Sequence, residues 1–370
     1  MRVLLTTPYD LAVPGGVNRH ALDLLDALTR RGIEARLVGP SSSIEMSADA
    51  RIVHLGQVRV QTMNGAQSRV TLDGRIGGEV RALLREFRPE VIHLQEPFLP
   101  VLNTFCLWHA GPAACVGTFH TYSEKSRGYL WAWPYCRWVN GRLRARIAVS
   151  VPAREFAAEF HPGDYQIVPN GVRLPPPTRL RPARPLGRPV RLVFVGRSDE
   201  PRKGFGVLIE ALRILESATP GAFALQVAGP GAAAWAGAAD GLPVTLAGQL
   251  TDHELSAAYA AADVCVLPSV GGESFGLVAL EALAHGVPVV ASRIRGYAEW
   301  LKDADAGALF APGDPEALAA ALRAVAADPA RHGEQARRAP AVAAPFGWDA
   351  VVERVLGVYA SARSKVLGRG

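Results

Sequence analysis

The sequence has few cysteines and no pairing pattern among them. Four occur in 370 residues, at Cys106, Cys115, Cys136 and Cys265, and no two of them form a CxxC motif. A domain held together by disulfides is not expected, because such domains are short and rich in cysteine. The four are predicted to be free, mostly buried thiols of a protein in a reducing compartment.

Long hydrophobic runs are also missing. No stretch approaches the ~20 apolar residues of a membrane-spanning helix, and the N-terminal segment MRVLLTTPYD lacks the cleavage pattern of a signal peptide. We expect a cytoplasmic protein whose contact with the inner face of the cell membrane, if any, is peripheral. The net charge of +6 permits an anionic partner. No basic stripe with interleaved aromatic residues predicts nucleic-acid binding.

Several signatures of common chemistry are absent. There is no Walker GxxxxGK[ST] loop, no GxSxG elbow and no His/Cys group with zinc spacing. Asp303-Ala304-Asp305 formally matches a DxD metal motif, but a polar turn before Gly307 explains it better. No motif requires a divalent metal or a tightly bound cofactor, so neither is predicted.

What the sequence does contain is an alternation of strands and helices. The apolar run Arg2–Thr7 is followed by a Pro/Gly loop, by a helical pattern over Val17–Arg31 and by a second apolar run. This order predicts an α/β domain with a parallel sheet. A second unit of the same kind begins with the predicted strand Leu192–Val195 and the predicted helix Phe205–Ser217.

Changes in composition divide the chain. Residues 1–170 form the first predicted domain, and residues 171–190, with many prolines and arginines, a solvated linker. Residues 191–345 form the second domain, and 346–370 a final helix expected over Phe346–Ala362. Because parallel sheets bind ligands at the carboxyl ends of their strands, the chemistry is expected in the strand-to-helix loops of both domains.

One loop of the second domain carries two cations suited to a phosphorylated ligand. Arg197 and Lys203 are separated by a turn that contains Pro201, and such a loop can fold both onto one diphosphate. A solvated charged loop is the alternative interpretation.

Another loop of that domain, GGESFG over residues 271–276, leads into a predicted helix, Leu277–His285. Glu273 precedes this helix and Glu281 lies two turns into it. Loop N–H groups would face an anion there, and the two carboxylates could accept hydrogen bonds from sugar and ribose hydroxyls. Alternatively, Glu273 caps the helix and Glu281 is an exposed helix residue.

The first domain offers two weaker candidates. Gly15 and Gly16 precede a predicted helix, where backbone N–H groups can approach an anion, although a simple turn explains them equally well. His120 follows the predicted strand Ala113–Phe119, at a position typical of strand-end catalytic residues. A structural role is the alternative for this histidine.

In combination these fragments resemble glycosyltransferase family 4, whose members are retaining enzymes of the GT-B fold. The stretch Glu273–Glu281 looks like the E-x7-E signature of that family, and Ile167–Val172 and Gly196–Gly204 match further motifs in the same order. The resemblance implies two Rossmann-like domains that face a central cleft, the first for the acceptor and the second for a nucleotide-sugar donor. It also implies that the final helix returns to the first domain.

The resemblance implies a role for each candidate residue. Arg197 and Lys203 would clamp the donor diphosphate. Glu273 would hold the sugar, Glu281 the ribose, and His120 would support the positive charge that develops on the sugar. The implied catalytic residues are therefore His120, Glu273, Arg197 and Lys203. The other implied donor-binding residues are Gly16, Gly229, Leu250, Phe275, Gly276, Leu277 and Glu281.

Within that family the chain is most similar to actinobacterial phosphatidylinositol mannosyltransferases, through stretches that include Pro8–Val17 and Asp199–Gly204. This implies GDP-mannose as donor and an anionic phospholipid as acceptor and membrane partner. The implied acceptor-binding residues are Tyr9, Asn18, Asn64, Arg69, Thr121 and Lys125. Met63 and Asn18 depart from the subfamily pattern, which has tyrosine and glutamine there. The aromatic segment Gly128–Trp138 suits a membrane interface, a packed loop or an oligomer contact.

Two alternatives keep the fold and change the function. One is an enzyme that uses a UDP- or ADP-linked sugar with a soluble or cell-wall acceptor. The other is a catalytically silent nucleotide-binding protein. The presence of all the implied catalytic residues argues against the silent protein.

Overall fold

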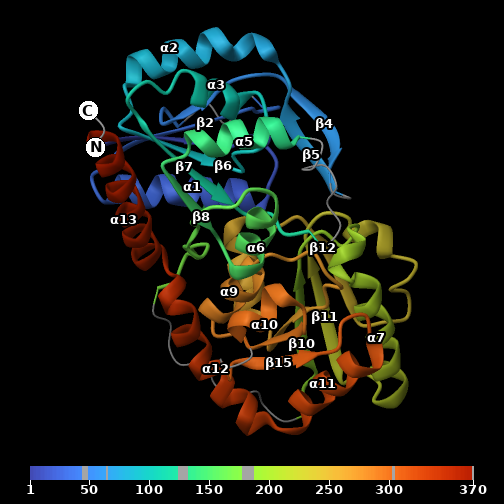
Figure 1. Ribbon diagram of the computed structural model, residues 1–370. Coiled ribbons are helices and arrows are strands. Elements are labelled where there is room, and N and C mark those ends of the chain that lie inside the picture. Colours follow the sequence, from blue (N-terminus) through green and yellow to red (C-terminus); the bar gives the residue numbers. More distant parts are fainter. Residues whose placement is uncertain (44–48, 64–65, 124–131, 177–186, 302–304, 369–370) are drawn as a thin grey trace. The chain divides into compact units, whose positions relative to one another are not determined.

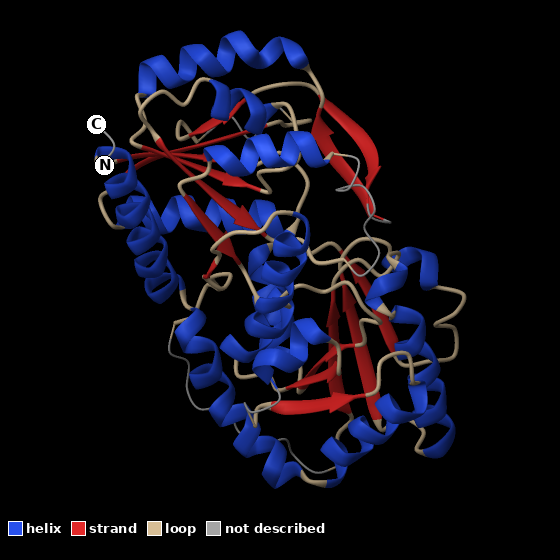
Figure 2. Ribbon diagram, in the orientation of Figure 1, coloured by secondary structure: helices blue, strands red, loops and turns tan. Residues whose placement is uncertain are grey.

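The computed structural model describes residues 1–43, 49–63, 66–123, 132–176, 187–301 and 305–368 (Figure 1). The chain divides into two compact units. Unit 1 combines Met1–Gly171 with Trp348–Gly370, and unit 2 is Val172–Gly347. Each unit has its own parallel sheet flanked by helices (Figure 2), so the α/β class predicted from the sequence is confirmed.

Unit 1 is built on a seven-stranded sheet in the order β3-β2-β1-β6-β7-β8-β9. Its strands are β1 (Arg2–Thr6), β2 (Glu34–Gly39), β3 (Ile52–His54), β6 (Val91–Gln95), β7 (Ala114–Phe119), β8 (Ala145–Ala148) and β9 (Gln166–Ile167). Its helices are α1 (Gly16–Arg30), α2 (Gly77–Phe87), α3 (Leu102–Trp108), α5 (Trp133–Arg142), α6 (Val151–Phe160) and α13 (Trp348–Leu367). An antiparallel hairpin, β4 (Val58–Met63) and β5 (Ala66–Thr71), stands apart from the sheet.

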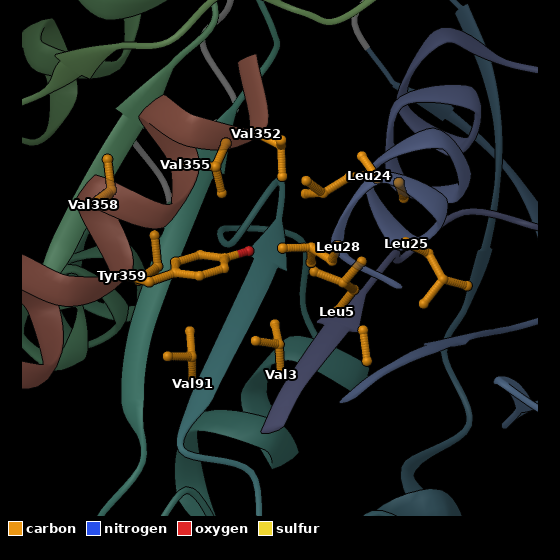
Figure 3. Close-up of a cluster of buried hydrophobic side chains, with 14 of the residues drawn as sticks. Val3, Leu5, Leu24, Leu25, Leu28, Val91, Val352, Val355, Val358 and Tyr359 are labelled. Carbon is orange, nitrogen blue, oxygen red and sulfur yellow. The ribbon is translucent and has the colours of Figure 1, made fainter. Parts of the chain in front are cut away.

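The central strands of unit 1 are buried on both faces, which is why they are continuous apolar runs in the sequence. In β1, Val3 and Leu5 join the cluster that contains α1 and α13, whereas Leu4 joins the cluster that contains α2 and α3. Figure 3 shows the first cluster, with the valines of α13 packed against the sheet. Each such fully buried side chain contributes about 1.5–3 kcal/mol to stability. Helix α13, although last in the chain, is therefore an integral part of unit 1.

Two hydrogen bonds in series cross this core. The hydroxyl of Tyr359, on α13, lies 2.7 Å from Nδ1 of His93 on β6, and Nε2 of His93 lies 2.6 Å from the Thr118 hydroxyl. In Figure 3 the Tyr359 oxygen turns from the helix toward the sheet. Both rings are fully buried, so these hydrogen bonds fix how α13 is seated on the strands.

Unit 2 contains a six-stranded parallel sheet in the order β12-β11-β10-β13-β14-β15. The strands are β10 (Val190–Val195), β11 (Phe223–Ala228), β12 (Val244–Gly248), β13 (Val264–Leu267), β14 (Val289–Ser292) and β15 (Gly307–Phe310). The helices are α7 (Phe205–Ala218), α8 (Asp252–Ala261), α9 (Leu277–Ala284), α10 (Arg295–Leu301), α11 (Pro315–Ala327) and α12 (Pro329–Ala343).

Some predicted element boundaries are wrong, and side chains explain why. The residues Ile147–Ser150 predict a strand that reaches Ser150, but β8 ends at Ala148 because the Ser150 hydroxyl accepts from the Ala153 N–H and caps α6. The final helix begins at Trp348 rather than Phe346, which belongs to a short 3-10 turn. The four cysteines are free and buried, as predicted.

Residues 177–186 of the predicted linker, 171–190, lie outside the described residues. Its arginines are not all solvated, contrary to the prediction. Arg188 makes two hydrogen bonds, of 2.8 and 2.7 Å, to the buried carboxylate of Asp263. Val190 is already the first residue of β10.

Candidate functional site

In each unit the candidate residues gather where the strand order reverses. In unit 2, β10 lies between β11 and β13, so the loops that leave the carboxyl ends of β10 and β13 flank one crevice. These loops are residues 196–204 and 268–276, the two segments that the sequence singled out. In unit 1, β1 lies between β2 and β6, and its crevice is flanked by the loop after β1 and by the end of β6.

An ion pair joins the two loops of unit 2. Nζ of Lys203 lies 2.8 and 2.9 Å from the two carboxylate oxygens of Glu273, and the side chains are only 17% and 14% exposed. Arg202 adds a longer contact of 3.4 Å to the same carboxylate. Burial opposes ionisation of Glu273, but Lys203 and Arg202 outweigh it and hold the pKa of this carboxyl below its ordinary value.

Arg197 does not join this pair. Its side chain is 47% exposed, and its described ion-pair partner is Asp199, at 3.4 Å. The predicted convergence of Arg197 and Lys203 on one anion therefore stays a prediction. A guanidinium this exposed is free to turn toward a ligand, because a pair at that distance and exposure is weak.

The N-terminus of α9 is open to an anion. Its N-cap is Gly276, which has no side chain, so Glu273 does not cap the helix. The backbone N–H groups of Phe275, Gly276 and Leu277 donate to no group in the described part of the chain. Further along the helix, Glu281 is half-buried and accepts from the Tyr259 hydroxyl at 3.1 Å. A carboxylate and free N–H groups at one helix end can bind hydroxyl and phosphate groups together.

Phe275 is fixed by its surroundings. Its buried ring packs against Trp300 and Phe346, and its carbonyl accepts from the Trp300 indole at 2.9 Å. The two remaining predicted donor positions lie after neighbouring strands. Gly229 approaches Gly196 so closely that a Cβ would meet its carbonyl oxygen at 2.2 Å, and the half-buried Leu250 follows β12.

In unit 1, His120 follows β7 and is 7% exposed. Its ring Nε2 lies 2.7 Å from Oε1 of Gln95, and its backbone N–H donates to the Glu96 carboxylate at 2.8 Å. Burial lowers the pKa of His120 well below its ordinary value, and the neighbouring His20 and His93 lower it further. The imidazole is therefore neutral near pH 7 and can offer a lone pair or an N–H to a ligand.

The residues that hold His120 were not predicted as site residues. Glu96 is 3% exposed, has a φ of 47°, and accepts from both the His120 N–H and the Thr121 hydroxyl. Burial raises the pKa of this carboxyl, although those two donors oppose the rise. A non-glycine residue at positive φ is strained and persists where the surroundings demand it, but nothing in the sequence marks Glu96 as strained.

The rings of His20 and Trp348 form a cluster next to His120. His20, on α1, lies with its ring centroid 4.9 Å from His120 and 5.2 Å from Trp348. Burial lowers the pKa of His20 to about 4, although Asn170 opposes the shift. Among the described residues, His20 Nδ1, Gln95 Nε2, Asn170 Oδ1 and Trp348 Nε1 are buried and have no partner in hydrogen-bond geometry.

The acceptor residues implied by the resemblance have different surroundings. Asn18 is buried, and its carboxamide pairs with the Thr7 hydroxyl and the carbonyls of Asp10 and Val13, so it holds the loop after β1. Tyr9 lies in that loop and bridges to Val70 of the hairpin.

The remaining predicted positions of unit 1 are less enclosed. Arg69 is exposed and reaches Asp10 only at 4.0 Å. Gly16 is exposed and is the first residue of α1, whose N-cap Gly15 has no side chain. Asn64 and Lys125 lie outside the described residues.

Within the described part of the chain, no group of three or more His, Cys, Asp and Glu side chains is placed to hold a metal ion. Among the helices that the structure describes, none combines the length and apolar character of a membrane span.

Family models match most of the chain. Residues 14–175 match the model described as Glycosyltransferase Family 4, and residues 189–328 match the model for glycosyl transferases group 1. The phosphatidyl-myo-inositol mannosyltransferase of Mycobacterium leprae is 35% identical, with 99% of each chain covered. A glycogen synthase of Mycobacterium tuberculosis is 30% identical, with 98% of this chain and 95% of that protein covered.

Solved structures support the fold. Sucrose-phosphate synthase from Thermosynechococcus elongatus matches with a TM-score of 0.73 at 22% identity, covering 98% of this chain and 99% of that one. Anabaena HepE in complex with UDP-glucose matches with a TM-score of 0.75 at 18% identity, covering 98% and 100%. The predicted GT-B fold is thereby confirmed.

Proposed function

Because the chain belongs to glycosyltransferase family 4, we propose that it is a retaining enzyme that transfers mannose from GDP-mannose to phosphatidylinositol or a related lipid. Glycosyltransferase activity follows from the family. The donor, the acceptor and the stereochemistry are the proposed part. The mannosyltransferases named above support mannose and a lipid acceptor, since they resemble this chain over nearly its whole length.

The observation that carries the proposal is the Lys203–Glu273 pair. A carboxylate beside a diphosphate site would repel the donor, and Lys203 cancels that charge while its third N–H stays available to phosphate. Glu273 then holds the sugar hydroxyls beside the reacting carbon. Arg197 and the free N–H groups of α9 stabilise the leaving diphosphate, where negative charge develops.

In the proposed reaction the acceptor hydroxyl attacks the anomeric carbon from the face that the diphosphate leaves. A new C–O bond forms as the bond between the anomeric carbon and the diphosphate oxygen breaks, and the leaving diphosphate accepts the proton of the acceptor hydroxyl, so configuration is retained. Neutral His120 faces the sugar and accommodates the positive charge that develops on it, which a protonated imidazole would oppose. No carboxylate acts as a nucleophile in this scheme, and Glu281 binds the ribose.

Unit 1 would take the lipid acceptor, with Tyr9, Arg69 and Thr121 as proposed contacts. Trp108 and Trp133 support contact with a membrane surface, because they are 68% and 49% exposed. Indole rings at such exposure favour the headgroup layer of a bilayer.

Arginines accompany these rings. Arg137 and Arg142 stack on Trp133 and Trp138, with centroid distances of 5.6 and 4.1 Å, so cations lie where anionic lipids would meet the rings. Part of the aromatic segment Gly128–Trp138 lies outside the described residues. Its Tyr135 bonds to Thr104 at 2.8 Å and has a packing role instead.

A second candidate is transfer from a UDP- or ADP-linked sugar to a soluble acceptor. The identity to a glycogen synthase and the likeness to a structure that holds UDP-glucose favour it. The donor loops described above would serve either reaction, since a diphosphate and a hexose are common to both.

A donor panel separates the two candidates. The protein is incubated with GDP-mannose, UDP-glucose or ADP-glucose, with and without phosphatidylinositol vesicles, and released nucleotide and labelled lipid are measured. Labelled lipid with GDP-mannose alone is the expected result. Lipid-independent turnover with UDP- or ADP-glucose would replace the lipid proposal with the second candidate. Lys203→Ala should be inactive with every donor, and Arg30→Ala, which removes an exposed cation of α1, should be fully active.

A further inference from the structure

Unit 1 has a second basic region, at the edge of its sheet opposite the candidate site. A cleft of about 630 Å³ lies where β1, β6 and β7 begin, and we name it the amino-edge cleft. Its charged lining comes from the strand β1, from α2, from the loop after α3 and from α13. The basic residues of this lining are Arg2, Arg81, Arg85, Arg88, His109 and Arg363.

Most of this positive charge is not neutralised. Arg81, Arg85 and Arg88 are exposed and form no ion pair with any residue that the structure describes. The one acidic residue of the lining, Glu90, is already engaged by the Arg2 N–H at 2.8 Å and by the Arg363 guanidinium. The cleft therefore presents several guanidinium groups that no protein carboxylate satisfies.

Two features of α2 that destabilise the helix occur together at the amino-edge cleft. Arg81 and Arg85 are four residues apart on one helix face, where like charges repel. Arg88 ends the helix with a φ of 47° and a ψ of 59°, a left-handed conformation that favours glycine. Its carbonyl accepts from the Arg2 side chain at 2.9 Å, which fixes this residue at the mouth of the cleft. Strained residues of this kind collect at binding sites.

We propose that the amino-edge cleft binds a compact soluble anion with two or more phosphate groups. Guanidinium forks bind phosphate oxygens in pairs, so three uncompensated arginines fit more than one phosphate. A volume of about 630 Å³ is in the range of small-molecule sites. The lining residues Leu84 and Ala114 are buried, which suits a small ligand better than a flat bilayer.

The test measures binding of sodium tripolyphosphate to the full-length protein by isothermal titration calorimetry. The Lys203→Ala background removes the proposed diphosphate site of unit 2. Arg85→Ala and Arg88→Gly should each weaken binding by about ten-fold or more, since each removes a charged hydrogen-bond donor. Arg30→Ala, which removes an equal charge at an exposed residue outside the lining of the cleft, should leave the affinity within two-fold. Arg88→Gly should also raise the melting temperature, because glycine relieves the left-handed strain.

A second arm addresses lipids, because Leu367 at the rim is 76% exposed. Cosedimentation with phosphatidylglycerol vesicles is compared for the same variants. Vesicle binding that depends on Arg85 without any tripolyphosphate binding would overturn the proposal in favour of a bilayer surface. Unchanged tripolyphosphate affinity in Arg85→Ala and Arg88→Gly would also overturn it. Neither result depends on the transfer reaction, because no activity is measured.

Discussion

The pair Lys203–Glu273 allows a prediction worked from its geometry. At 2.8 Å and an effective dielectric constant of about 20, the attraction between two unit charges is roughly 6 kcal/mol before desolvation is counted. Burial of both groups offsets much of this. Removing one partner leaves the other charge with little compensation, and such changes cost about 3–5 kcal/mol. When Lys203 is removed, Glu273 keeps only the longer contact to Arg202.

A double-mutant cycle measures this coupling. Lys203→Met and Glu273→Gln are each expected to lower the unfolding free energy of unit 2 by about 3 kcal/mol. The cost of the double variant should be about 2 kcal/mol smaller than the sum of the two single costs, because neither partner is left with an unpaired charge. Urea unfolding followed by circular dichroism and fluorescence gives the free energies, with the transition of each unit fitted separately.

The same three variants separate structure from function. All of them should lack glycosyl transfer, including the double variant whose stability is largely recovered. Single-variant costs that add to within ~0.5 kcal/mol in the double variant would refute the reasoning, since they would mean that the two charges do not interact. Transfer by the double variant at the normal rate would refute the functional role while leaving the pair as a structural feature.

Three further predictions concern the supports of the two candidate sites. Gly204→Ala should destabilise unit 2 by roughly 3 kcal/mol in thermal unfolding, because φ is +66° and a Cβ would lie 2.0 Å from the Pro268 carbonyl oxygen. Gly206→Ala is the control and should be neutral or stabilising, because its Cβ would meet the Trp235 ring at 3.5 Å, an ordinary van der Waals contact. Lowering the pH from 6.5 to 5.5 should cost unit 1 about 1 kcal/mol for each of His20 and His93, measured by urea unfolding at both pH values. Because the folded pKa values are about 4 and about 3, only the unfolded chain takes up these protons in this pH range, so the protein becomes less stable as the pH is lowered. An unchanged unfolding free energy would contradict the neutral, buried rings. Tyr359→Phe should cost about 1–2 kcal/mol because it leaves buried His93 without its 2.7 Å partner; a thermal shift indistinguishable from zero would show that this hydrogen bond does not hold α13.

The parallel strands were the easiest elements to predict, for a physical reason. A strand buried on both faces is an apolar run, as the predicted strand Ala113–Phe119 illustrates, which is observed as β7 over Ala114–Phe119. Elements with mixed patterns were not predicted. Trp133–Arg142 alternates aromatic and basic residues without a clear helical period, and Pro329–Ala343 contains an internal proline at Pro340. Both become helices because tertiary packing overrides local preference.

The candidate site was predictable as a set of residues but not as a set of contacts. Lys203 and Glu273 each stood out from their own loop, yet they are 70 residues apart in sequence and only the neighbouring positions of β10 and β13 bring them together. Glu96 and His20 were not predicted as site residues, because their burial beside His120 arises only from the packing of β6, β7 and α1.

The stereochemistry of transfer tests the central proposal most directly. The protein is supplied with GDP-mannose labelled in the sugar and with phosphatidylinositol vesicles, and the anomeric configuration of the labelled lipid is determined by NMR. The account predicts a mannosyl lipid with the α configuration of the donor. A β-linked product would contradict the retaining mechanism, and the absence of labelled lipid, with the nucleotide sugar intact, would contradict the proposed donor and acceptor.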